Sequence, residues 1–326
     1  MPQLVFRRAL VIPLALLVAN FVGFAYAHWA RAAQAARNPY LTEVTTGPLP
    51  EAYGMYLAGV AHLDFGQLPN QVAVADALIT AGGASLGLLA LALILSVVAG
   101  LVLGLAATRV VPPGVAGWLN GLSSVGLAMP SFYLGSLLVL GSVYYVLWGP
   151  GMAPPIPVQG FGWDLHLVFP LITLTLRPAV QIARVTASLL SEQLREQYVL
   201  AARSFGHPWR AIRWRLALRN IYAAVALTIA GSFRLLMGEL IIVEWLFNWP
   251  GLGRLFAITL IPNLSSSAFG AVAPGYLNPP LVAAILTVST GLFLASDVLA
   301  SVLARLFDPR LSAAHVETVS RQDALP

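Results

Sequence analysis

Long apolar stretches separated by short polar segments dominate this 326-residue sequence. A helix needs about 20 predominantly apolar residues to cross a bilayer. Six stretches approach or exceed that length, at residues 10–27, 77–107, 119–148, 166–190, 221–246 and 281–303. The pattern predicts an all-α membrane protein with six transmembrane helices. The second and third stretches are longer than a bilayer requires, so we expect these helices to tilt or to extend beyond the membrane.

The polar segments divide the chain into four parts. We interpret residues 1–28 as an N-terminal transmembrane helix, 29–75 as an extracytoplasmic cap segment, 76–304 as a core of five transmembrane helices with a cytoplasmic loop at 191–219, and 305–326 as a cytoplasmic tail. The first span also resembles a secretory signal. We favour a retained span, because its apolar run is longer than the roughly 7–15 residues that are usual for a signal.

Charge is scarce, and its placement predicts the orientation. Only 10% of residues are charged and 58% are hydrophobic, against about 25% charged in soluble domains, so most of the surface must meet lipid. Arginine-rich segments near spans tend to stay in the cytoplasm. Placing both termini inside leaves only Arg31, Arg37 and Arg254 on the outer side. The absence of cysteine excludes disulfides and thiolate ligands, and the scattered histidines predict no metal site.

The polar loop before the fifth span has the pattern of two helices with a break between them. Residues 192–204 are rich in helix formers, with Leu194, Tyr198 and Ala201 or Ala202 at helical spacing on one stripe. Gly206 fits the left-handed position that ends a helix, and Pro208 fits the first turn of the next one. Spacing alone leaves open a plain basic loop or an amphipathic helix lying on the membrane surface.

The segment YVLAARSFG at 198–206 resembles the EAA loop of ABC importer permeases, in the form carried by the dipeptide, oligopeptide and nickel family. The resemblance continues through the Leu-Arg-Asn sequence at 218–220. It implies that the loop is the coupling helix that docks on an ATPase subunit. Phe205 stands where a lysine is usual, which bears on the strength and partner choice of docking. The residues to which the resemblance assigns this coupling are Tyr198, Ala201, Ala202, Arg203 and Gly206.

A second segment, EWLFNWPGLGRL at 244–255, looks like the family's block at the outer end of the fifth span. Glycines around a proline allow a tight turn there, and the aromatic residues could close the mouth of a pathway. An ordinary interfacial aromatic belt is the alternative. Weaker similarities at 63–66, 129–132 and 308–310 extend the match along most of the chain, and 260–280 fits least well. The candidate gate residues are Glu244, Phe247, Pro250, Gly251 and Gly253.

Three charged residues fall inside predicted spans: Arg177, Arg234 and Glu239. Each costs about 2.5–3.5 kcal/mol or more if it faces lipid near the midplane, so each must find a partner or water. One hypothesis is that they line a translocation pathway, where an arginine meets a carboxylate and Glu239 meets an amine. The other is an Arg–Glu pair that locks helices together. We expect Asp297, in the last span, to make a structural helix contact.

The resemblance implies a type I ABC importer permease fold and a place in the bacterial inner membrane. It implies no cofactor in this chain, since ATP and Mg would be bound by partners, and the chain contains no G-x-x-x-x-G-K-[ST] phosphate loop. An ion-coupled carrier would show inverted repeats, and a membrane-embedded enzyme would show a catalytic motif; both remain alternatives without such support. The implied partners are a second homologous permease subunit, two ATPase subunits, an extracytoplasmic solute-binding protein that delivers peptides or similar small solutes, and the lipid bilayer, with no nucleic acid.

Overall fold

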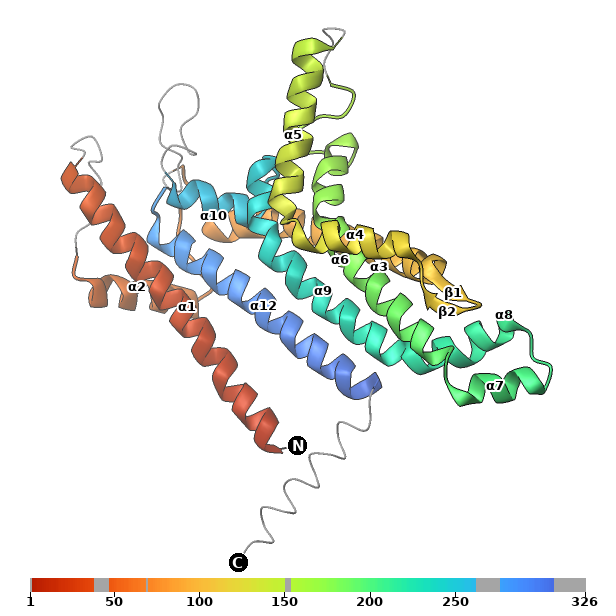
Figure 1. Ribbon diagram of the computed structural model, residues 1–326. Helices are drawn as coiled ribbons and strands as arrows, with labels where there is room; N and C mark the ends of the chain where they lie inside the picture. The colour runs from red at the N-terminus through yellow and green to blue at the C-terminus, as the bar shows by residue number, and fades with distance from the viewer. Residues whose placement is uncertain (1, 38–46, 69, 150–153, 262–275, 308–326) are drawn as a thin grey trace, which may run out of the picture. The chain divides into compact units, whose positions relative to one another are not determined.

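The computed structural model describes residues 2–37, 47–68, 70–149, 154–261 and 276–307. Most of the predicted tail and part of the predicted cap therefore lie outside the described residues. The elements in chain order (Figure 1) are α1 (Pro2–Arg37), α2 (Leu49–Ala61), α3 (Val74–Ala107), β1 (Thr108–Val110), β2 (Pro113–Val115), α4 (Gly117–Ala128), α5 (Ser131–Trp148), the 3-10 helix η1 (Leu165–Leu167), α6 (Val168–Gln193), α7 (Gln197–Ser204), α8 (Trp209–Ala211), the π-helix η2 (Ile212–Ala217), α9 (Leu218–Leu246), α10 (Leu252–Leu260) and α12 (Pro279–Phe307).

Six helical segments of the described chain are long and apolar enough to cross a membrane, which confirms the predicted helical membrane fold. They are Leu10–Ala33, Val74–Ala107, Ser131–Trp148, Leu165–Gln193, Trp209–Leu246 and Pro279–Val302. The fifth begins well before the predicted residue 221, because α8, η2 and α9 follow one another without a break. A two-stranded hairpin of β1 and β2, which hydropathy did not predict, follows the end of α3.

The third predicted span is wrong in one respect: residues 119–148 do not form a single long helix. They divide into α4 and α5 at Met129 and Pro130. Proline has no N–H to donate to the preceding turn and disfavours the helical conformation in the residue before it. Met129 accordingly has extended backbone angles, with φ −83° and ψ 120°. Hydropathy alone hid this break, because the flanking residues on both sides are apolar.

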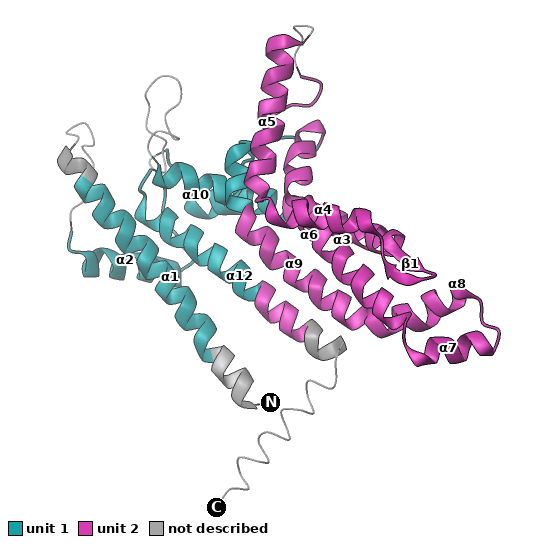
Figure 2. Cartoon of the chain, viewed as in Figure 1, with its two compact units in different colours: residues 1–87, 159–163, 240–295 teal, residues 88–158, 164–239, 296–326 magenta. Residues whose placement is uncertain are grey.

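The chain forms two compact units, which Figure 2 shows in different colours. Unit 1 contains residues 1–87, 159–163 and 240–295. Within it, Asn20 of α1 donates a hydrogen bond to Thr287 of α12 (3.0 Å) and accepts one from Tyr53 of α2 (3.1 Å). Gly23 lies so close to α12 that an added Cβ would come within 3.0 Å of the Ala283 backbone. Small and polar residues thus let α1, α2 and α12 pack closely.

Unit 2 contains residues 88–158, 164–239 and 296–326. Helix α6 is its most buried element, with buried residues along its whole length. The second half of α3 packs against α6 through Gly100 and Gly104. An added Cβ on Gly104 would lie 2.7 Å from the Ala183 carbonyl, and one on Gly100 would lie 2.8 Å from the Ala179 carbonyl. Only glycine permits this close approach of the two helix backbones.

Candidate functional site

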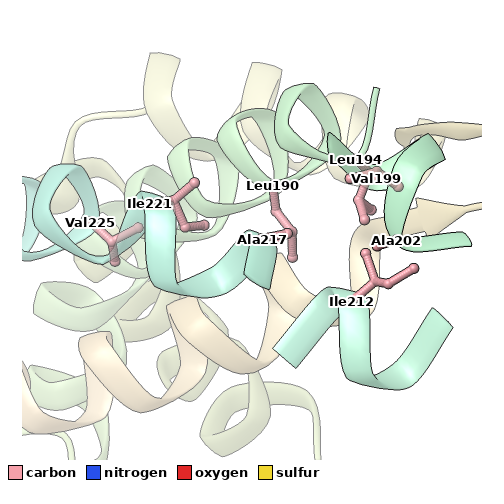
Figure 3. Packing of buried hydrophobic residues seen from close by; sticks show 8 residues of the cluster. All are labelled: Leu190, Leu194, Val199, Ala202, Ile212, Ala217, Ile221 and Val225. Carbon is pink, nitrogen blue, oxygen red and sulfur yellow. The ribbon is translucent and has the colours of Figure 1, made fainter. Parts of the chain in front are cut away.

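Helix α7, the segment that resembles a coupling helix, lies on a small apolar core at one end of unit 2 (Figure 3). Val199 and Ala202 of α7 point into this core. They pack with residues from the end of α6, from η2 and from the start of α9, namely Leu190, Leu194, Ile212, Ala217, Ile221 and Val225. Only one face of α7 packs on this core, and the opposite face of the helix makes no contact with it.

The predicted helix over 192–204 is wrong at its start. Helix α6 continues to Gln193, a turn follows, and α7 begins at Gln197. The predicted stripe is confirmed in the form that contains Ala202: Leu194 and Ala202 are buried in the core and Tyr198 packs against it, whereas Ala201 is exposed. The spacing thus identified the buried face, but it did not reveal the turn between α6 and α7.

The break after α7 has the hydrogen bonds of a Schellman motif, and the prediction for Gly206 is confirmed. Its φ is +83°, its N–H donates to the Arg203 carbonyl at 2.9 Å, and the His207 N–H donates to the Ala202 carbonyl at 3.1 Å. Pro208 was predicted in the first turn of the next helix. The structure instead places it immediately before that helix, at the N-cap, with ψ 149°.

Arg203 stabilises this break. Its guanidinium donates to the His207 carbonyl at 3.0 Å and lies 4.9 Å from the centre of the Trp209 ring, within cation–π range. Of the residues predicted to couple, Arg203, Ala202 and Gly206 therefore all contribute to the local structure of the loop.

Four polar side chains that were not among the predicted functional residues hold this loop in place: Gln193, Asn220, Arg213 and Arg195. The Gln193 Oε1 atom accepts from the Tyr198 hydroxyl and from the Asn220 amide, both at 3.0 Å, which joins the end of α6 to α7 and to the start of α9. Partial burial raises the pKa of the Tyr198 hydroxyl. The Arg213 guanidinium donates to the Leu105 carbonyl at the end of α3. Arg195 likewise donates to a carbonyl of β2, at 3.1 Å.

The face of α7 away from the core is exposed and presents apolar residues among polar ones such as Gln197 and Ser204. We call Leu200, Ala201 and Phe205 the α7 outer face. Phe205 is 82% exposed and Leu200 is 69% exposed. Phe205 could have been singled out from the sequence, because it stands where the family that this segment resembles usually has lysine. Tyr198 and Ala202 point the other way, so the predicted coupling residues divide between the two faces.

In the second motif, Glu244 connects three segments of unit 1. Its side chain is fully buried and accepts hydrogen bonds from the Ser85 hydroxyl of α3 (2.5 Å) and from the Gly253 N–H of α10 (2.6 Å). Ser85 in turn accepts from the Leu252 N–H at 2.8 Å. An added Cβ at Gly251 would overlap the Glu244 carboxyl group, and one at Gly253 would overlap the backbone of α9. Both glycines are therefore required by close packing.

Two of the three aromatic residues of the second motif are buried within unit 1, whereas Trp245 is exposed. Phe247 and Trp249 are almost fully enclosed, and the Trp249 indole donates to the Ala84 carbonyl of α3 at 3.1 Å. Residues Phe161 and Trp163 pack edge to face on Trp249, with ring centres 4.8 and 5.6 Å apart. This contribution from the 159–163 segment was not predicted. A gate role for Phe247 stays a prediction.

The charged residues within the spans form ion pairs in unit 2. Arg177 of α6 pairs with Glu239 of α9, with 2.7 Å between Nη1 and Oε1. Arg234 of α9 pairs with Asp297 of α12. An Arg–Glu pair was one of the two predicted alternatives, and the helix contact expected of Asp297 is an ion pair. Among the described residues, no cluster of His, Cys, Asp or Glu could hold a metal ion.

Comparisons with known proteins match the region that contains these features. Residues 96–313 match the model of the family described as binding-protein-dependent transport system inner membrane component. The probable peptide ABC transporter permease protein y4tP of Sinorhizobium fredii is 28% identical over 196 residues, 58% of this chain and 56% of that protein. The oligopeptide transport system permease protein AppB of Bacillus subtilis is 26% identical over 190 residues, 57% of this chain and 56% of that protein.

A shorter match has higher identity. The glutathione transport system permease protein GsiC of Pectobacterium atrosepticum is 35% identical over 130 residues, which is 40% of each chain. The chain thus spans about half the length, or less, of the curated relatives that it matches.

Proposed function

Because this chain belongs to the family of binding-protein-dependent transport system inner membrane components, we propose that it is one of two permease subunits of an ATP-driven ABC importer. Its solutes are peptides or similar small molecules, the class named for the relatives above. A second permease subunit completes the pathway, two ATPase subunits bind ATP and Mg, and an extracytoplasmic binding protein delivers the solute. In this proposal both termini are cytoplasmic.

The observation that carries the proposal is the attachment of α7. Its outer face offers exposed apolar side chains to a partner, whereas its inner face is packed on α6, η2 and α9. Gln193 fixes α7 to two long helices, and Arg213 connects the same region to the end of a third. A displacement of α7 by an ATPase would therefore be transmitted directly to three candidate membrane spans.

The pathway in this proposal runs beside α9. The charged side chains of Arg177, Arg234 and Glu239 supply polar groups along its length, where a membrane-spanning helix otherwise offers only apolar surface. At the far end of α9, Glu244 anchors the turn that contains Pro250, Gly251 and Gly253. In the proposal this turn, together with Phe247, shapes the outer gate.

The coupling role is tested by replacing Phe205 with aspartate and measuring how much ATPase co-purifies with the tagged chain. Phe205 is 82% exposed, so the substitution leaves the fold intact, and we expect most of the ATPase to be lost. Leu63→Asp is the matched control: its side chain is 80% exposed and lies on the predicted outer side. If Phe205→Asp retained ATPase at the native level, the proposal that the α7 outer face docks on the ATPase would be wrong.

The two alternative functions predict different behaviour of the isolated chain. An ion-coupled carrier would take up peptide into liposomes under a proton or sodium gradient without any ATPase. A membrane enzyme would convert a substrate without partners. Uptake that requires ATP and the partner subunits distinguishes the importer from both.

A further inference from the structure

The ion pair between Arg234 and Asp297 differs from the other intramembrane pair in its exposure. Both side chains of this pair are about half exposed, 46% for Arg234 and 48% for Asp297. In the other pair Arg177 is 37% exposed, but its carboxylate partner Glu239 is only 13% exposed. Both partners lie within candidate spans, Arg234 in Trp209–Leu246 and Asp297 in the last two turns of Pro279–Val302. Charged side chains at such depth almost always face a bundle interior or a water-filled cavity, because contact with lipid is costly. The open side of this pair therefore faces water or protein.

The surface of α9 around Arg234 also carries two glycines. Gly231 and Gly238 lie three residues before and four residues after Arg234, which places all three on one face of the helix. An added Cβ at either glycine would meet no atom within 4 Å. By contrast, Gly100 and Gly104 of α3 are filled by contacts with α6. At both glycines the space that a side chain would occupy is therefore open among the described residues.

We propose that Arg234 and Asp297 form the solute-recognition pair of the pathway, and that they bind zwitterionic solutes that carry an ammonium group and a carboxylate. On binding, the pair separates, so that Arg234 binds the carboxylate and Asp297 binds the ammonium group. The solute brings no net charge, and each charge keeps a partner of opposite sign throughout. When the solute leaves, the pair forms again. This inference rests on the proposed importer function.

The geometry favours Asp297 over Glu239 for the ammonium group. Glu239 is mostly buried, and its Oε1 atom is engaged by Arg177 at 2.7 Å. Asp297 is half exposed and lies on a different helix from Arg234, so small movements of α9 and α12 open or close the pair. The absence of side chains at Gly231 and Gly238 lets a peptide backbone approach α9 beside the pair.

Because the chain has no cysteine, accessibility can be measured in Gly231→Cys and Gly238→Cys, with the native chain as the unlabelled control. The complete complex in liposomes is treated with an anionic, membrane-impermeant thiol reagent. We expect both cysteines to react, and a mixture of free dipeptides to slow the reaction about tenfold. The same mixture with acetylated amino and amidated carboxyl ends should give no protection. Absence of labelling, which a covering permease subunit would produce, or equal protection by both mixtures would overturn the proposal.

Reversing the pair separates recognition from structure. The double variant Arg234→Asp with Asp297→Arg keeps the attraction between α9 and α12, and we expect native amounts of assembled complex. Uptake of free dipeptides should fall about tenfold or more, because the exchanged charges would hold the solute with its amino and carboxyl ends reversed relative to the rest of the pathway. Native uptake by this variant would overturn the inference and leave the importer function intact. If the native complex shows no ATP-dependent uptake, the proposed function itself fails. Should the double variant not assemble, the cysteine measurement decides.

Discussion

Replacing Glu244 with alanine is expected to loosen the contact that holds the start of α10 against α3. The carboxyl group is fully buried and accepts from the Ser85 hydroxyl and the Gly253 N–H. Both donors are buried as well. Removing the acceptor leaves them without a partner in a region that the packing of Trp249 closes to water.

The magnitude follows from these two donors. A buried donor left without an acceptor costs about 1–3 kcal/mol, so Glu244→Ala should lower the free energy of unfolding by roughly 2–6 kcal/mol. Glu244→Gln keeps one oxygen for one donor but turns an amide N–H toward the other. It should therefore cost about half as much.

The assay is thermal unfolding of the purified complex in detergent, followed by tryptophan fluorescence, since Trp163 and Trp249 contact each other beside the site. Glu192→Ala is the control, because Glu192 is exposed at the end of α6 and should change stability by less than about 0.5 kcal/mol. Equal unfolding midpoints for Glu244→Ala and the control would refute the reasoning.

Three further substitutions test the packing and the coupling. Gly104→Val should lower the free energy of unfolding by about 1–3 kcal/mol, because an added Cβ meets the backbone of α6. Gly121→Val is the control, since an added Cβ there meets nothing within 4 Å. The unfolding midpoint should therefore fall for Gly104→Val and not for Gly121→Val. Ala202→Leu should overfill the core beneath α7 at a similar cost, while Ala201→Leu on the exposed face should leave stability unchanged and alter ATPase co-purification. Gln193→Leu removes two hydrogen bonds, worth about 0.5–1.5 kcal/mol each, that attach α7 to α6 and α9. The ATPase should therefore remain bound while the uptake per ATP hydrolysed falls. An unchanged ratio of uptake to ATP hydrolysis would contradict the proposal that α7 transmits motion to these helices.

The mechanical consequence of the fold is that α7 has two separate tasks. Its inner residues, such as Val199, attach it to the helices, and its outer residues, such as Phe205, remain available to a partner. Substitutions on the inner face should therefore lower stability, whereas substitutions on the outer face should weaken docking of a partner. The EAA-like motif includes residues of both kinds.

Features that depend on neighbours in the chain could be predicted from the amino-acid sequence. Six spans could be predicted because the length and apolarity of a helix are local properties. Gly206 could be predicted as a helix end because only a residue without Cβ adopts that backbone conformation easily. The break at Pro130 was also readable in principle, since proline acts on its own turn, although continuous hydropathy concealed it.

Contacts between residues distant in the chain follow instead from how the helices pack. Arg234 could pair with either Glu239 or Asp297 on composition alone, and the packing of α9 beside α12 selects Asp297. The burial of Trp249 beneath residues 159–163, and the position of Gln193 between α7 and α9, were likewise invisible to hydrophobic spacing. The physical reason is that hydropathy sums over sequence neighbours. Ion pairs and hydrogen bonds depend instead on the rotation and separation of helices distant in sequence.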